Sequence, residues 1–129
     1  MPFSIRSLAR QQPPRIAWEA IKNKILSERY ELSLVFVGSE RMKTLNARYR
    51  KKPKTTNVLA FPLGRDSGEI FMDLTVARRE APLYPMPYRR YVQYLYIHAL
   101  LHLNGFDHDT KRAHIRMDKE EHKWLNVLR

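Results

Sequence analysis

The chain has 129 residues, 43% of them apolar, and a formal net charge of +11. This length suits one domain with a modest core, and the apolar content argues against disorder. Cysteine is absent, which excludes disulfides and leaves histidine and carboxylates as metal ligands. No apolar run approaches the roughly 20 residues that cross a bilayer, and the N-terminus lacks a secretory segment. We therefore expect a single domain over residues 1–129, cytoplasmic and without a membrane partner.

The charge favours a polyanionic partner. Lysine and arginine number 24 against 13 acidic residues, which points to nucleic acid first and to an acidic membrane surface second. The densest basic segment lies between residues 41 and 54 and holds no acid, and Pro53 predicts that it forms a loop. Such a loop can follow a phosphate backbone or be an ordinary solvated turn. Its basic residues are Arg41, Lys43, Arg48, Arg50, Lys51, Lys52 and Lys54.

Hydrophobic periodicity predicts the elements of the first half. After an irregular or strand-like segment over residues 1–15, we expect a helix over 16–29, a buried strand over 32–37 and a helix over about 40–48. Ser39 is a candidate cap for that second helix. Its core-facing side chains are predicted to be Met42, Leu45 and Tyr49.

The second half begins with a predicted hairpin of strands over 56–63 and 69–73, with Pro62 near an edge. A helix over 75–80 and a proline-stiffened connector over 81–87 follow. We then expect a long helix over 88–104 and a last helix capped by Asp109 or Thr110.

Three histidines near the end of the long helix form the main candidate site. His98 and His102 are four residues apart, so a helix places them on one face, about 6 Å apart along its axis. Gly105 can end the helix in a left-handed conformation, which allows His108 to approach the same ion. Three ligands without an obvious fourth indicate an open, catalytic type of zinc site.

Alternative interpretations of these histidines remain. A pair at this spacing can also lie on a helix surface, as we expect for His114 and His122. A related spacing occurs in zinc proteases, where a glutamate after the first histidine is the general base. Here that position is Ala99, which cannot transfer a proton.

Three segments of the chain resemble the YbeY family of bacterial endoribonucleases, which act in ribosomal RNA maturation. The likeness runs from about Leu32 to Leu128. Its blocks are Leu45–Arg50 with Thr56–Pro62, then Gly68–Ile70, and His98–His108, of which the histidine block is the most specific. The chain departs from the family pattern at Pro53, Thr55, Asn57, Ala60 and Ala99.

The resemblance implies an α+β fold, in which a mixed, zincin-like four-stranded sheet packs with helices. It implies one zinc ion held by His98, His102 and His108, with Arg50 facing it across a cleft. It also implies a single-strand-specific, zinc-dependent endoribonuclease that acts on the 3′ end of 16S rRNA and in ribosome quality control. The ribosome and its assembly factors would be partners, and DNA would not.

We assign the remaining candidate residues by chemistry. Arg50 can stabilise charge that develops on a phosphate. Asp107 can orient a histidine or cap the turn, and Asn57 can help to position substrate. The RNA backbone is expected to contact Arg48, Lys51, Lys52 and Lys54. No side chain presents itself as a general base, so a 2′-hydroxyl of RNA can be the nucleophile.

Two other functions fit parts of the sequence. One is a ribosome-assembly protein that binds RNA and whose zinc is not catalytic. The other is a metalloprotease, which the histidine spacing suggests but which Ala99 and the basic charge oppose.

Overall fold

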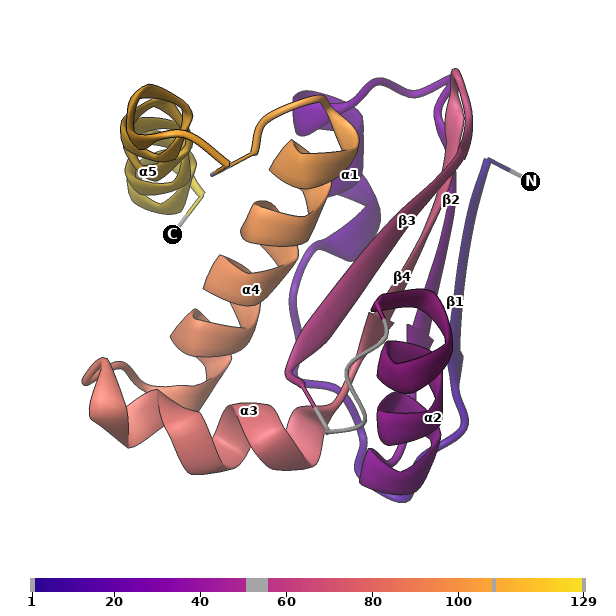
Figure 1. Cartoon of the computed structure of the whole chain (residues 1–129). Coiled ribbons are helices and arrows are strands. Elements are labelled where there is room, and N and C mark those ends of the chain that lie inside the picture. The colour runs from indigo at the N-terminus through magenta and orange to yellow at the C-terminus, as the bar shows by residue number, and fades with distance from the viewer. Residues whose placement is uncertain (1, 51–55, 108, 129) are drawn as a thin grey trace.

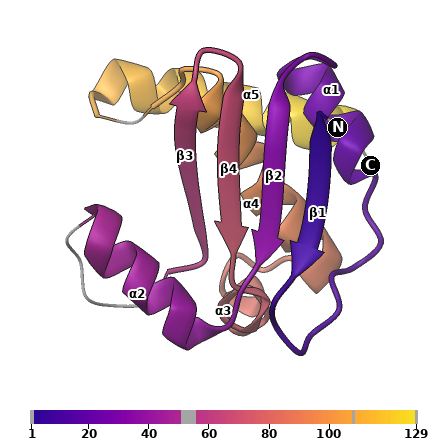
Figure 2. The same cartoon turned by 90° about the vertical axis from the view of Figure 1, so that its right-hand side faces the viewer.

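A computed structural model describes residues 2–50, 56–107 and 109–128. Within these ranges the chain forms one four-stranded sheet in the order β1-β2-β4-β3. The strands β1, β2 and β4 run parallel, and β3 pairs antiparallel with β4 (Figure 2). Their bounds are Phe3–Ser7 for β1, Glu31–Phe36 for β2, Val58–Gly64 for β3 and Ser67–Met72 for β4.

The helices lie on both faces of this sheet. The long helix α4 and helix α1 cover one face, α5 lies outside α4, and α2 covers the other face (Figure 1). The predicted α+β fold with a mixed four-stranded sheet is confirmed. The bounds are Trp18–Ile25 for α1, Ser39–Arg50 for α2, Leu74–Glu80 for α3, Ala81–Leu83 for the 3₁₀ turn η1, Tyr88–Leu103 for α4 and Lys111–Val127 for α5.

Strand β2 separates two hydrophobic clusters. Leu34 and Phe36 belong to the large cluster beneath α1, α4 and α5, whereas Val35 belongs to a smaller one with Met42 of α2. Successive side chains of a strand point to opposite faces, so a strand covered on both sides becomes continuously apolar. This arrangement explains the apolar segment that was predicted as a buried strand.

A buried carboxylate joins α2 to α3. Asp73 is fully buried and caps α3, because its Oδ1 accepts hydrogen bonds from the backbone N–H groups of Thr75 and Val76. Its Oδ2 accepts a 2.6 Å hydrogen bond from the hydroxyl of Ser39. Ser39 was predicted to cap its own helix, but it is the first residue of α2 and donates to the cap of α3.

Several predicted boundaries and contacts are wrong. The helix predicted over 16–29 ends at Ile25. The basic segment is not simply a loop, because Arg41, Lys43 and Arg48 lie within α2, which continues to residue 50. Tyr49 does not face the core and is 56% exposed, because the last turn of α2 extends beyond the small cluster under that helix.

The predicted hairpin and its edge are confirmed. Pro62 lies in β3, which pairs only with β4 in the described sheet, so its missing N–H costs no ladder hydrogen bond on the open side. None of the described helices has the length and apolar character needed to span a membrane.

Candidate functional site

Helix α4 and strand β3 form the walls of a pocket of about 360 Å³. His98, Ala99 and His102 line it from α4, and Tyr49 reaches it from the last turn of α2. Four consecutive residues of β3, Val58 to Phe61, supply the opposite wall. The predicted histidine pair therefore faces a single cavity, with His98 half-buried and His102 exposed.

The end of α4 is fixed by Gly105. Its φ of +97° is in the left-handed region, and the N–H of Gly105 donates to the carbonyl of His102 at 3.1 Å. The N–H of Phe106 donates to the carbonyl of Leu101 at 3.0 Å. These two bonds form a Schellman motif, so the predicted glycine stop is confirmed three residues after His102.

A buried acid on α5 contacts the first histidine. The Nδ1 atom of His98 hydrogen-bonds with Oε2 of Glu121, whose side chain is 6% exposed. A carboxylate only accepts, so Nδ1 donates to it, and the other ring nitrogen, Nε2, points away from Glu121. Metal-binding histidines are commonly held in this way by a carboxylate behind the ring.

Sequence reasoning missed Glu121. Met117, Glu121 and Leu125 follow each other at intervals of four and are all buried, so this acid occupies a core position of α5. An acid on the apolar face of an amphipathic helix is a readable signal, because buried carboxylates require a partner.

Tyr94 completes the environment of this acid. Its hydroxyl is 3.5 Å from Oε1 of Glu121. Burial, followed by the nearby charge of Glu121, raises the pKa of Tyr94 to about 12. The tyrosine therefore stays protonated at neutral pH and can donate to the carboxylate.

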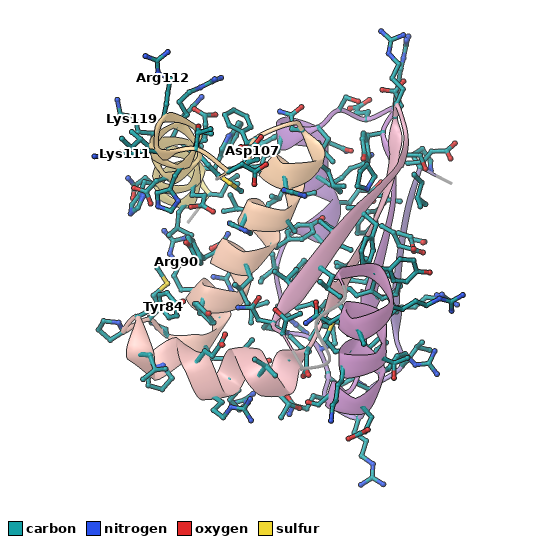
Figure 3. The ribbon with its side chains drawn as sticks, in the orientation of Figure 1. Tyr84, Arg90, Asp107, Lys111, Arg112 and Lys119 are labelled. Carbon is teal, nitrogen blue, oxygen red and sulfur yellow. The ribbon has the colours of Figure 1, made fainter. Side chains whose placement is uncertain are left out.

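The loop after α4 contains two further predicted residues. His108 lies outside the described residues, and the described ones contain no group of three metal-ligating side chains. Asp107 caps a turn, because its Oδ1 accepts a 3.1 Å hydrogen bond from the N–H of Asp109. Figure 3 shows Asp107 between α4 and α5, whereas Lys111, Arg112 and Lys119 extend outward from α5.

Asn57 lies beside the start of β3 and contacts α3. Its amide nitrogen donates to Oε1 of Glu80 at 2.9 Å, and the hydroxyl of Tyr91 donates to the same oxygen at 2.9 Å. The backbone carbonyl of Asn57 also accepts from the N–H of Asp73. These contacts anchor the strand that forms one wall of the pocket, and a substrate role for Asn57 stays a prediction.

The predicted phosphate-binding residues lie on α2 or after it. Arg48 is exposed, and its guanidinium is 5.7 Å from the centre of the Tyr49 ring. Arg50 ends the helix, directly after the residue that lines the pocket. The side chain of Arg50 lies outside the described part of the structure, and so do the residues Lys51, Lys52 and Lys54.

His114 and His122 do not join the pocket. Both are exposed on α5, and Nδ1 of His122 is 2.8 Å from the backbone carbonyl of Asp118. His98 and His102 line the pocket instead, and the prediction that His114 and His122 are surface residues is confirmed.

Known proteins resemble this chain in sequence and in fold. A solution structure of a protein from Thermotoga maritima superposes with a TM-score of 0.68 at 22% identity, covering 98% of this chain and 88% of that one. "Endoribonuclease YbeY" of Campylobacter jejuni is 35% identical over 96 residues, which cover 70% of this chain and 72% of the relative.

"Endoribonuclease YbeY" of Sinorhizobium medicae is 35% identical over 116 residues, covering 83% of this chain and 69% of the relative. The family described as "Endoribonuclease YbeY" matches residues 6–129, which include the histidine pair, the pocket and Glu121. The chain therefore belongs to the YbeY endoribonuclease family.

Proposed function

We propose that this chain is a zinc-dependent endoribonuclease that cleaves single-stranded segments of small-subunit ribosomal RNA. The proposal extends to processing at the 3′ end of 16S rRNA and to ribosome quality control, with the ribosome and assembly factors as partners in the cytoplasm. It is supported by family membership, by the net charge of +11 and by the site on α4.

The observation that carries the proposal is the orientation of the histidine pair. Glu121 holds Nδ1 of His98, and His102 lies one helical turn further along the same pocket. An imidazole with one nitrogen held from behind, as in His98, fits a zinc ion better than a harder cation such as magnesium. We propose His108 as the third ligand and describe the fold as zincin-like on the same basis.

A bound zinc ion would polarise a phosphate oxygen and lower the pKa of a coordinated water. The remaining roles at the site would belong to residues of the chain. His98 and His102 would hold the ion, Glu121 would orient His98, and Arg50 would neutralise charge on the phosphate. The described pocket lining includes two imidazoles and no carboxylate.

The nucleophile proposed for this site is the 2′-hydroxyl of the RNA itself. Its oxygen would form the new bond to phosphorus and release its proton to water. The bond from phosphorus to the 5′ oxygen of the next nucleotide would break, and that oxygen would take up a proton from water. One product would then end in a cyclic phosphate, which mass spectrometry of the cleaved RNA detects.

The test compares cleavage of a small-subunit rRNA fragment by four purified proteins, with zinc content measured on each. These are the wild type, His98→Ala/His102→Ala, Arg50→Ala and His114→Ala/His122→Ala. The last variant is a matched control, because it also removes two histidines but removes them from the exposed face of α5.

We expect cleavage to disappear in the first two variants, with zinc lost only from the variant in which His98 and His102 are replaced. The control should keep both cleavage and zinc. Equal cleavage by all four proteins would show a contaminating nuclease and contradict the proposal. Zinc binding without cleavage by the wild type would favour an RNA-binding role, and chelator-sensitive digestion of casein would indicate a protease.

A further inference from the structure

We propose that Tyr49 and Phe61 form a stacking platform that binds one unpaired base of the RNA beside the histidine pair. This inference rests on the proposed function and names what occupies the apolar part of the pocket. Both rings line the same cavity as His98 and His102. The cavity volume of about 360 Å³ lies at the lower end of the range for small-molecule sites.

A third aromatic ring supports this platform from beneath. The rings of Tyr49 and Phe61 have their centres 4.9 Å apart and are tilted by 48°. Phe61 in turn meets Phe71 edge-on at 5.9 Å. Phe61 and Phe71 pack against the buried cluster under α2, so the outer ring is held by an anchored stack.

Tyr49 is open to solvent although it belongs to this stack. It is 56% exposed, whereas Met42, which is seven residues earlier on the same face of α2, is fully buried. A large exposed ring beside two candidate metal ligands is available to a ligand, and the faces of nucleobases commonly bind such rings.

The charge around the platform favours RNA over an apolar peptide. The guanidinium of Arg48 is 5.7 Å from the centre of the Tyr49 ring, and Arg41 and Lys43 are exposed on the same helix. Aromatic rings beside cationic side chains are typical of single-strand binding grooves, because the ring takes the base and the cations take the phosphates.

This platform selects unpaired RNA. Within a duplex, both faces of a base are covered by its stacked neighbours, so an inner base cannot reach Tyr49 without leaving the helix. The π face is common to all four bases, so the platform tolerates sequence variation. The occupant is therefore one unpaired nucleobase beside the bond that is cleaved.

The experiment uses the purified full-length protein and a short single-stranded 2′-O-methyl RNA that carries the fluorescent base 2-aminopurine. Stacking on an aromatic ring quenches this base, and electrophoresis verifies that the probe stays intact. The variants are Tyr49→Leu, Tyr49→Phe and Tyr84→Leu. Tyr84 is a matched control, because it is 54% exposed and stacks on Tyr91 at the turn before α4 (Figure 3), away from the pocket lining.

We expect Tyr49→Leu to weaken binding about tenfold or more and to abolish quenching, because the stacking of a base on an aromatic ring supplies much of the affinity for single strands. Tyr49→Phe should keep both binding and quenching, and Tyr84→Leu should behave as the wild type. The effect of Tyr49→Leu should be absent with a blunt duplex probe. Circular dichroism on each variant verifies the fold.

Unchanged quenching in folded Tyr49→Leu would overturn the platform, and so would an equal loss in Tyr84→Leu. If an aromatic peptide displaced the RNA probe, the surface around Tyr49 would be assigned to a protein partner instead. The probe reports binding and not cleavage, so an inactive protein that shows Tyr49-dependent quenching would contradict the proposed ribonuclease and leave the platform standing. An active ribonuclease without that dependence would contradict the platform alone.

Discussion

The imidazole of His98 on α4 donates from Nδ1 to the buried carboxylate of Glu121 on α5. The two residues are 23 positions apart and meet because α5 packs along α4. The contact determines which ring nitrogen faces the pocket, and so it links the packing of the last helix to the chemistry of the site.

Replacing Glu121 with glutamine is expected to lower zinc affinity about 10- to 100-fold, since partners behind metal ligands commonly have effects of this size. The amide preserves the shape of the side chain but loses its charge. Competition with a chromophoric chelator measures the affinity. The control is Glu120→Gln. Glu120 lies on the outer side of α5, where its carboxylate is 3.9 Å from the ammonium group of Lys123. Equal zinc affinity in the two variants would show that Glu121 does not support the zinc site.

Gly68 of β4 is expected to tolerate no larger side chain. A Cβ atom there would lie 2.5 Å from the hydroxyl of Tyr30 and 3.0 Å from a methyl group of Leu103, the residue after His102. We expect Gly68→Ala to lower the free energy of unfolding by about 1–3 kcal/mol through overpacking. Urea unfolding measures this loss.

Gly38→Ala is the control for Gly68→Ala, because its added Cβ would meet no atom within 4 Å. It should change the free energy of unfolding much less. A Gly68→Ala protein as stable as Gly38→Ala would show that Tyr30 and Leu103 shift without cost.

Gly105 is expected to be sensitive for a different reason. Nothing lies within 4 Å of a Cβ atom added there, but its φ is +97°. Gly105→Ala should cost about 1–2 kcal/mol in conformational strain alone, and Gly105→Asn should cost less, because asparagine adopts left-handed conformations more readily. Thermal unfolding ranks the three proteins, and alanine and asparagine variants of equal stability would contradict this explanation.

Alkaline pH is expected to destabilise the fold through its tyrosines. Burial raises the pKa of Tyr94 to about 12 and also raises the pKa of Tyr91 and Tyr96. Above about pH 10 the unfolded chain loses these protons while the folded chain retains them. The stabilising contribution is therefore complete below about pH 10 and is lost as the pH rises towards 12.

Melting temperatures measured across this window should fall less steeply for Tyr94→Phe than for the wild type, because phenylalanine has no proton to lose. Absorbance of the phenolate follows the titration in parallel. Superimposable pH profiles of the two proteins would show that Tyr94 does not contribute.

Local sequence determined most of the elements and the histidine pair. The spacing of His98 and His102 and the position of Gly105 depend only on helical periodicity and on the left-handed preference of glycine. The hairpin around Pro62 follows from local turn chemistry in the same way. These features depend on neighbouring residues and not on distant contacts, so the sequence alone predicts them.

Tertiary structure decided which side chains surround that pair. Glu121 contacts His98 only because α5 returns along α4, and Tyr49 reaches the pocket only because α2 extends past the cluster that buries Met42. Glu121 was missed from the sequence, and Tyr49 was wrongly predicted to face the core. A helical pattern reveals which face is apolar but not where the packed surface ends. The sequence by itself determined the ligand pair, and only the packing of α2 and α5 determined the acid that orients it and the ring beside it.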